Sequence, residues 1–161
     1  MALDPVPYRV EAAKKFGADE AVPPSEKASQ VLRGMNEGRL ADRIFVCTGS
    51  EIANLHALEY VERGGVVLFF APTDPGVHIP LSINDVFFRN DITLTTSYGA
   101  SPYDSRVALQ LIRCQIVNVK EMITHRLPLE ETERGFRLVA EARDSLKVII
   151  KPQEKGKEKE G

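Results

Sequence analysis

Short apolar runs alternate with stretches of helical periodicity along this chain. The runs RIFVCT (43–48) and VVLFFA (66–71) are continuous, which is typical of strands that are covered on both faces of a sheet. Between them, SEIANLHALEYVERGG fits a helix that Ser50 caps and that the glycine pair 64 and 65 ends. This alternation predicts an α/β fold with a mostly parallel sheet and helices on both of its faces.

Two further helices precede the first of these strands. Residues 7–16 place apolar side chains on one helical face, and Gly17 follows as a stop signal. Ser25 is positioned to cap a second helix, which Gly38 would end. The apolar face of that second helix comprises Val31, Leu32 and Met35. Residues 1–4 have the character of the end of a strand, so the chain begins in the middle of the repeating pattern.

The remainder of the chain continues the alternation. Its predicted elements are a proline-stiffened loop at 72–80, an amphipathic segment at 83–90, a strand at 91–98, a helix at 103–114, an extended segment at 122–128, a helix at 129–142 and a strand at 146–151. Residues 153–161 carry many charges and no apolar side chain, which predicts a disordered, solvated tail.

Composition restricts the class of protein. With 161 residues, of which 43% are apolar, the chain has room for one domain with a buried core. A formal net charge of -2 argues against electrostatic binding of nucleic acid or of an anionic membrane. No apolar run approaches the roughly 20 residues that span a bilayer, and no signal-peptide pattern is present. We therefore expect a cytoplasmic protein with no nucleic-acid or membrane partner.

The cysteines and histidines do not form a ligand pattern. Cys47 and Cys114 lie inside apolar stretches and are predicted to be buried core residues rather than disulfide partners or zinc ligands. His56, His78 and His125 fall on a helix, a loop and a strand edge, without ligand-like spacing, and each is predicted to be structural. We therefore expect no metal site in this chain.

The order of several short motifs resembles a specific family. The motifs are DPVPYRVEAAKKFGAD, CTGS, FFRNDITLTTSYGASP, ITHRLPLEE and LKVIIKP. Their order and spacing are similar to those of the cofactor-binding half of the medium-chain dehydrogenases, in particular the zinc-dependent alcohol and polyol dehydrogenases of the sorbitol and threonine type. The resemblance covers residues 2–152. It implies an oxidoreductase that transfers hydride between a secondary alcohol or polyol and NAD.

The resemblance also implies a domain organisation. Residues 1–118 would form a partial NAD-binding Rossmann domain, and residues 119–152 would pack with the substrate domain of the family. Relative to the family, the sequence lacks the substrate and zinc domain and the first strand, glycine-rich turn and first helix of the Rossmann domain. None of its 11 glycines forms Gly-x-Gly-x-x-Gly, and no Gly-His-Glu zinc motif is present. Zinc is therefore expected only in the missing domain, no catalytic residue is expected here, and the chain alone is expected to be inactive.

The missing strand would leave a gap in the sheet. In the usual strand order 3-2-1-4-5-6 this strand lies at the centre. Its absence leaves two edges, whose unpaired backbone groups cost about 1–3 kcal/mol each when they are buried. The gap could close by a shift of the neighbouring strands, by strand exchange in a homo-oligomer, or by a complementary N-terminal chain. The expected partners are therefore a second copy or such a chain, together with a small alcohol or polyol substrate.

By resemblance, five residues lie on the adenosine side of the cofactor. Asp4 ends the second Rossmann strand and would accept hydrogen bonds from the ribose hydroxyls, so that NAD is expected rather than NADP. A turn aspartate before proline is the alternative for Asp4. Arg9 would pack near the adenine, or would be a solvated arginine on the first helical turn. Thr48, Gly49 and Ser50 would lie along the adenosine, although a helix cap alone predicts the same residues.

Six further contacts are implied at two strand ends and at the last strand. At the two strand ends, backbone groups of family members hold the nicotinamide carboxamide. The corresponding residues here are Phe70, Ala71, Pro72, Ser97 and Tyr98. Family members often have glycine at the position of Phe70, so this part of the site differs. Lys147 falls where relatives carry Arg or Lys near the pyrophosphate, and a surface cation is the alternative.

Two other functions stay open on the sequence alone. The chain could be a non-catalytic remnant that acts in oligomerisation or in weak nucleotide binding. It could also be half of a zinc-free quinone reductase, because that branch shares the same cofactor-binding half. The motifs SYGASP and ITHRLPLEE favour the zinc-dependent branch.

Overall fold

The computed structural model describes residues 1–25 and 27–153. The tail predicted at 153–161 lies outside the described residues except for Gln153. The chain folds as two compact units, one built from Met1–Pro24 together with the chain from Ser101 onward, and the other from Ser25–Ala100. The boundary predicted between residues 118 and 119 stays a prediction.

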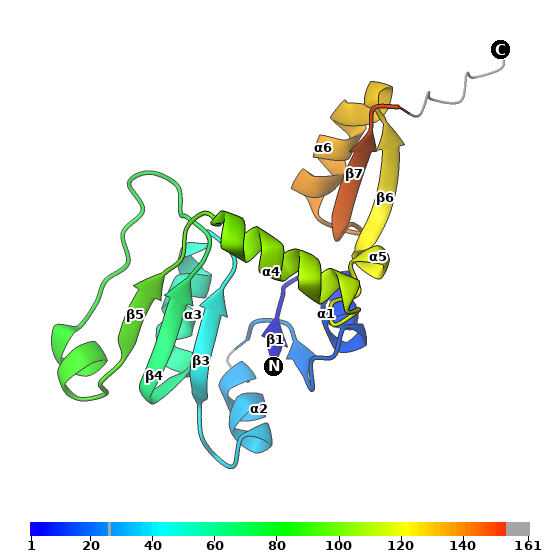
Figure 1. Cartoon of the computed structure of the whole chain (residues 1–161). Helices are drawn as coiled ribbons and strands as arrows, with labels where there is room; N and C mark the ends of the chain where they lie inside the picture. Colours follow the sequence, from blue (N-terminus) through cyan, green and yellow to red (C-terminus); the bar gives the residue numbers. More distant parts are fainter. Residues whose placement is uncertain (26, 154–161) are drawn as a thin grey trace. The chain divides into compact units, whose positions relative to one another are not determined.

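The unit Ser25–Ala100 is built on a parallel sheet (Figure 1). Its strands are ordered β3-β4-β5, and both strand pairs are parallel. In chain order the elements are α2 (Ala28–Met35), β3 (Ala41–Val46), α3 (Glu51–Tyr60), β4 (Val61–Phe69), the π-helix η1 (Asn84–Phe88) and β5 (Thr93–Thr96). These elements occur in the order that the hydrophobic pattern predicts, with each helix between two extended segments.

One face of this sheet carries the hydrophobic core. The buried core residues are Val46, Ala57, Val61, Val67, Val86 and Ile92. They come from all three strands or their flanks, from α3 and from η1, so that both helices cover the same core. Burial of such β-branched side chains is the main favourable contribution to folding, at about 25 cal/mol per Å² of apolar surface.

The opposite face of β3 is open in the part of the chain that the structure describes. Phe45 is 66% exposed, whereas Val46, one residue later, is buried. The continuous apolar run predicted coverage on both faces, and for β3 this prediction is wrong. Because β3 is at the end of the strand order, its second edge also lacks a partner strand among the described residues.

Helix α3 ends earlier than the sequence predicts. The glycine pair 64 and 65 was the expected end, but α3 stops at Tyr60 and β4 begins at Val61. Ala41 pairs with Val61 and Arg43 pairs with Val66, so residues 62–65 bulge out of the ladder. The bulge is anchored by the Glu62 carboxylate, which accepts hydrogen bonds from the backbone N–H of Leu40 (2.7 Å) and of Arg63 (3.0 Å).

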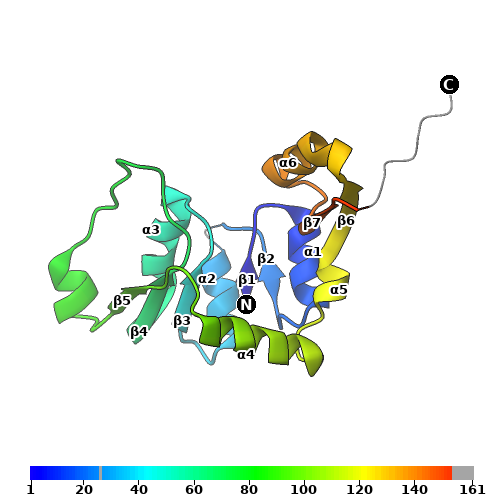
Figure 2. The same ribbon diagram turned by 45° about the horizontal axis from the view of Figure 1, so that its top comes forward.

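The second unit contains two short parallel strand pairs (Figure 2). β1 pairs with β2, and β6 pairs with β7, with α6 packed against both β6 and β7. The elements are β1 (Ala2–Leu3), α1 (Pro7–Lys15), β2 (Ala21–Val22), α4 (Pro102–Arg113), α5 (Val119–Met122), β6 (Ile123–Pro128), the 3-10 helix η2 (Leu129–Glu131), α6 (Thr132–Glu141) and β7 (Lys147–Lys151). The sequence analysis did not predict the short helix α5.

The end of α1 lies where the sequence predicts it, whereas the start of α2 does not. Helix α1 ends before Gly17, whose φ of 101° is accessible to glycine at little cost and closes the helix. At α2 the predicted Ser25 cap is wrong, because the N-cap is Lys27 and no side chain of the residues that the structure describes caps the helix. Ser25 instead offers its backbone carbonyl, which accepts hydrogen bonds from Ala28 N–H (2.9 Å) and from the Tyr60 hydroxyl (3.2 Å).

Within residues 1–25 and 27–153, the strands form three separate parallel sheets. Among the described residues, no strand connects the pair β1-β2 to the sheet β3-β4-β5. This break falls where the sequence predicts a missing central strand. The predicted fold class, an incomplete Rossmann-type α/β protein, is confirmed.

The two cysteines are exposed, so their predicted burial in the core is wrong. Cys47 directly follows the last residue of β3 and therefore leaves the sheet. Cys114 is the C-cap of α4, a helix whose residues 102–113 are all exposed. Within residues 1–25 and 27–153, no helix has the length and apolar character needed to cross a membrane.

Candidate functional site

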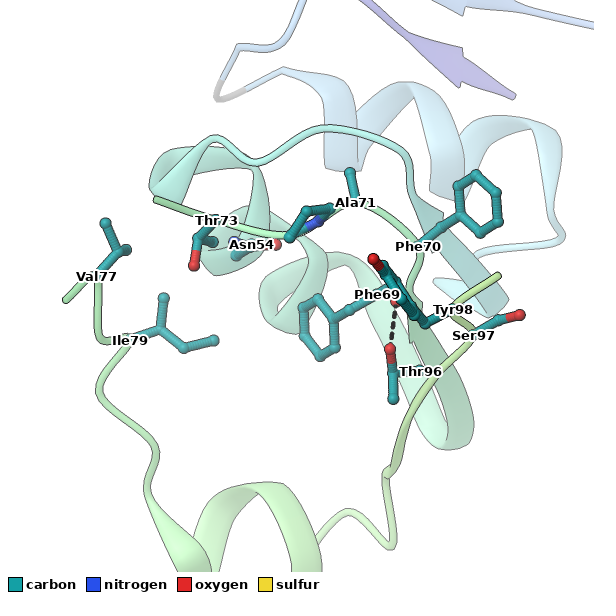
Figure 3. A pocket seen from close by; sticks show the side chains of 11 residues that line it. Asn54, Phe69, Phe70, Ala71, Thr73, Val77, Ile79, Thr96, Ser97 and Tyr98 are labelled. Carbon is teal, nitrogen blue, oxygen red and sulfur yellow. Dashed lines mark hydrogen bonds between the residues drawn. The ribbon is translucent and has the colours of Figure 1, made fainter. Parts of the chain in front are cut away.

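A pocket of about 310 Å³ lies beyond the carboxyl ends of β4 and β5 (Figure 3). Its walls come from the segment after β4, the segment after β5, the loop around residues 77–79 and the first turns of α3. The lining residues are Asn54, Phe69, Phe70, Ala71, Pro72, Thr73, Val77, Ile79, Thr96, Ser97 and Tyr98. In open parallel sheets, ligands bind outside the carboxyl ends of the strands. This pocket is therefore the candidate site.

The structure brings together the residues that the sequence assigned to the nicotinamide end. Phe70, Ala71 and Pro72 follow β4, and Ser97 and Tyr98 follow β5, and all five line the pocket. In Figure 3 the Phe70 ring points away from the cavity centre. Their contact with NAD stays a prediction.

The loop from β3 to α3 supports the pocket wall from outside. A Cβ atom on Gly49 would lie 2.4 Å from the carbonyl oxygen of Pro72, which only glycine avoids. Ser50 caps α3 by accepting a hydrogen bond from Ala53 N–H (3.4 Å), and Thr48 Oγ1 accepts one from Ser50 N–H (3.3 Å). These three residues therefore have structural roles in the loop, and their predicted contact with adenosine is a separate question.

The pocket is mainly apolar and carries no charge on its described lining residues. Figure 3 shows Val77 and Ile79 on one side, with Phe69 opposite them. The Thr96 hydroxyl donates a hydrogen bond to the Phe69 carbonyl at 3.0 Å, so this hydroxyl proton is not available to a ligand in the pocket. A neutral, planar group with few polar atoms fits such a lining better than a phosphate or carboxylate does.

The sequence analysis missed six of the lining residues, and among these six Asn54 is the one with a buried polar side chain. It is only 4% exposed, and its Oδ1 is buried without a hydrogen-bond partner among the described residues. An unsatisfied buried polar group costs about 1–3 kcal/mol, so such a group calls for an explanation. The signal was present in the sequence, because Asn54 shares a helical face with the buried Ala57 and Tyr60.

The predicted adenosine residues Asp4 and Arg9 lie in the other unit. Asp4 follows β1, and its Oδ1 accepts a hydrogen bond from Val6 N–H at 2.9 Å. Arg9 Nη1 lies 3.9 Å from Asp4 Oδ2, while Arg9 Nε is buried with no partner among the described residues. The structure thus places these two side chains together. Lys147, the predicted pyrophosphate residue, is exposed at the start of β7.

A zinc ion does not fit the residues that the structure describes. Within 1–25 and 27–153, no three or more His, Cys, Asp or Glu side chains gather closely enough to hold a metal. His56 stacks on Tyr60, with ring centroids 5.5 Å apart. His125 Nδ1 lies 3.0 Å from the hydroxyl oxygen of Thr124, and His78 is exposed in the loop after β4.

The topology and the pocket define a class of protein, an α/β protein of incomplete Rossmann type with its candidate site at the strand ends. The chain belongs to the zinc-binding dehydrogenase family, whose profile matches residues 1–113.

The chain is similar to curated and structurally characterised dehydrogenases. The chain is 30% identical, over 94% of its length, to an L-threonine 3-dehydrogenase of Caldanaerobacter subterraneus. It is 32% identical, over 96% of its length, to alcohol dehydrogenase 1 of Pisum sativum. The structure superimposes on an alcohol dehydrogenase of Thermotoga maritima with a TM-score of 0.80 and 27% identity over 94% of this chain.

The match covers only part of each relative. The chain spans 44% of the Caldanaerobacter enzyme, 41% of the Pisum enzyme and 42% of the Thermotoga chain.

Proposed function

We propose that this chain is the cofactor-binding part of an NAD-dependent dehydrogenase that acts on a secondary alcohol or polyol in the cytoplasm. The observation that supports this proposal most directly is the pocket at the ends of β4 and β5. It is lined by five of the residues that the family resemblance assigned to the nicotinamide end. Membership of the zinc-binding dehydrogenase family supports the reaction class.

The residues of this chain would bind and orient the cofactor. NAD, when bound, supplies the carbon that accepts hydride from the alcohol. Asp4 and Arg9 would hold the adenosine, the loop 48–50 would lie along it, and Lys147 would balance the pyrophosphate charge. The segments after β4 and β5 would hold the nicotinamide ring against the mainly apolar lining of the pocket.

Activation of the alcohol would come from outside this sequence. Because the described residues do not fit zinc, we propose that the metal belongs to the part of the family enzymes that this chain does not match. That part, or a second copy of this chain, is the proposed partner. The open edge and the exposed Phe45 of β3 support an association of this kind.

The proposal is tested by cofactor binding and its selectivity. NADH and NADPH are titrated into the wild-type chain and into Asp4→Asn, with binding followed by NADH fluorescence. We expect NADH to bind more tightly than NADPH, and this preference to fall by about tenfold in the variant, because the carboxylate bonds to the ribose and repels the extra phosphate. The exposed Asp19→Asn is the matched control and should keep the preference.

The outcomes separate the proposed function from a non-catalytic role. A wild-type chain that binds neither dinucleotide at millimolar concentration would favour a role in association only. Binding without any dependence on Asp4 would contradict the assignment of the adenosine site, although the nicotinamide pocket would stand.

A further inference from the structure

An ion pair joins helix α1 to helix α5 within the unit that contains both. Lys15 Nζ, in the last turn of α1, lies 2.7 Å from Glu121 Oε2 in α5. Figure 1 and Figure 2 both show α5 beside α1. We propose that this ion pair is a tether that fixes the orientation of the C-terminal body, defined as residues 123–151, relative to α1. This inference goes beyond the proposed function and does not depend on it.

The C-terminal body packs on itself. Strands β6 and β7 pair in parallel, and α6 packs against both of them. Gly135 of α6 is buried, and a Cβ atom there would lie 3.0 Å from Ile150 Cδ1 of β7, so the helix and the strand are in close contact. Leu127 of β6 is buried as well. A body with its own packing can rotate as one piece about the segment that connects it.

The segment between α4 and α5 provides the place for such a rotation. Residues 114–116 and 118 are exposed, so little side-chain packing fixes this segment. The backbone N–H groups of Gln115 and Ile116 still donate to carbonyls of α4, at 3.1 and 3.0 Å. The hinge is therefore expected after Ile116, at residues 117 and 118, because a few loop residues are enough to absorb the change in backbone dihedrals.

Asn118 holds the Glu121 carboxylate in position for the tether. Asn118 Nδ2 donates to Glu121 Oε1 at 2.5 Å, and the Glu121 N–H donates to Asn118 Oδ1 at 3.4 Å. The other carboxylate oxygen, Oε2, accepts from Lys15. This hydrogen bond lowers the pKa of Glu121 and raises the pKa of Lys15, so both groups are charged at neutral pH. A carboxylate that is already held loses less rotamer freedom when the ion pair forms.

The expected strength of the tether suits a reversible contact. The side chains of Lys15 and Glu121 are 64% and 48% exposed, so water and salt screen their attraction. Exposed ion pairs favour the paired state by about one-and-a-half- to fivefold. A preference of this size makes one orientation of the C-terminal body the major one. It is also small enough for a partner chain that binds residues 119–152 to shift the population to another orientation.

The test measures the distance between α1 and α6 directly. Spin labels are attached at Glu11→Cys on α1 and at Ala140→Cys on α6, two exposed positions, in the full chain. The two exposed native cysteines are removed as Cys47→Ser and Cys114→Ser. Pulsed electron paramagnetic resonance then gives the distribution of distances between the labels. The population at the main distance, relative to all other distances, is compared between variants.

We expect one main distance in the labelled chain, and Lys15→Gln should lower its relative population about two- to fivefold. Salt at about 1 M, where the screening length is about 3 Å, should have the same effect on the labelled chain and little effect on the variant. Lys15→Glu alone should lower the population, and its combination with Glu121→Lys should restore it. The matched control Lys14→Gln breaks the Lys14–Glu20 ion pair (2.5 Å) in the same helical turn and should keep the distribution.

The inference is overturned if Lys15→Gln keeps the original distribution, because the ion pair would then not fix the orientation. It is also overturned if Lys14→Gln has an equal effect, since any charge in the last turn of α1 would then suffice, or if the exchange of charges restores nothing. Should the exchanged pair fail to fold, Lys15→Arg replaces it, and this variant must keep the main distance because it keeps the charge. None of these results depends on cofactor binding, so the proposed function is tested separately.

Discussion

At Gly49 the space that a side chain needs is filled by the backbone of the neighbouring loop. A Cβ atom there would lie 2.4 Å from the Pro72 carbonyl oxygen. Gly49→Ala must therefore push the two loops apart, and we expect a loss of about 1–3 kcal/mol in the free energy of unfolding, as for an overpacked site. Urea unfolding followed by circular dichroism measures this loss.

A second glycine provides the matched control. Gly34 lies in α2, and a Cβ atom there would meet nothing within 4 Å. Gly34→Ala should therefore stabilise the protein by up to about 1 kcal/mol through its higher helix propensity. If both alanine variants were to change stability in the same direction, the close contact at Gly49 would not be the cause.

Protonation of the Glu62 carboxylate makes the stability of the fold depend on pH. The hydrogen bond from the Leu40 N–H, with a second from Arg63 N–H, lowers the pKa of Glu62 below its ordinary value of 4.5. A lowered folded-state pKa contributes stability above the ordinary pKa, and this contribution is lost as pH falls through the folded-state pKa. We expect Glu62→Gln to unfold with a weaker acid dependence below pH 4.5 than the wild type.

The measurement is the urea midpoint at a series of pH values. Glu59→Gln, which removes an exposed carboxylate from α3, is the control and should keep the wild-type slope. An unchanged slope in Glu62→Gln would mean that the bulge at residues 62–65 is held by other contacts.

Sequence patterns predict single residues well where a residue type has one dominant role. Gly17 follows its helix as predicted because a left-handed backbone favours glycine. Cys47 could not be placed in this way, and for Asn54 the helical pattern indicates a buried position but not the lack of a hydrogen-bond partner. Whether a cysteine in an apolar run is buried depends on what covers that run, and whether an asparagine on an apolar helix face is unpaired depends on residues far along the chain.

At the scale of elements, α4 is the helix that depends most on its own sequence. Residues 102–113 are all exposed, so burial does not stabilise it within the described part of the chain. Its N-terminus has a capping box, in which Asp104 N–H donates to Ser101 Oγ (3.2 Å) and Ser101 N–H donates to Asp104 Oδ2 (2.8 Å). Ser101→Ala should destabilise the helix by about 1 kcal/mol.

Hydrogen exchange locates this effect. Amides of α4 should exchange faster in Ser101→Ala, while those of α6 and β7 keep their rates, because an unpacked helix opens locally. Ser105→Ala, in the interior of the same helix, is the control and should slow exchange, since alanine is the better helix former. Faster exchange throughout the chain would show that α4 is coupled to the remaining structure.

Element type follows from the sequence more reliably than element length. The strands β3, β4 and β5 and the helix α3 are predicted in the correct order, because continuous apolar runs differ from helical periodicity, whereas the amphipathic segment predicted at 83–90 contains the π-helix η1. The end of α3 is missed, since the glycine pair 64 and 65 belongs to a bulge whose position depends on pairing with β3. Local patterns do not contain the register of a partner strand.

At the scale of the whole molecule, β3 combines an exposed face at Phe45 with an edge that has no partner strand among the described residues, so it is the surface where we expect a partner chain to bind. We expect the unmatched part of the Thermotoga maritima alcohol dehydrogenase, mixed with this chain, to slow hydrogen exchange at the amides of Ala41–Val46. Alcohol-dependent NADH formation should appear in the same mixture. Phe45→Lys should reduce both effects, because a charge would replace the exposed ring.

The matched control for this mixture places the same change elsewhere. Phe88→Lys alters another exposed phenylalanine, on η1, and should leave both effects intact. Protection that is equal in the wild type and in Phe45→Lys would mean that the partner binds away from β3.

The exposed edge of β3 also affects how the chain behaves during its synthesis. An unpaired strand beside an exposed aromatic ring is a template on which another copy can add its own strand. In each newly made copy, two reactions therefore compete for the edge of β3. One is binding to a complementary partner, and the other is addition to an aggregate of further copies. Aggregation rises steeply with the concentration of unpartnered chains, so slow expression at low temperature should yield protein in solution, whereas rapid overproduction should fill inclusion bodies.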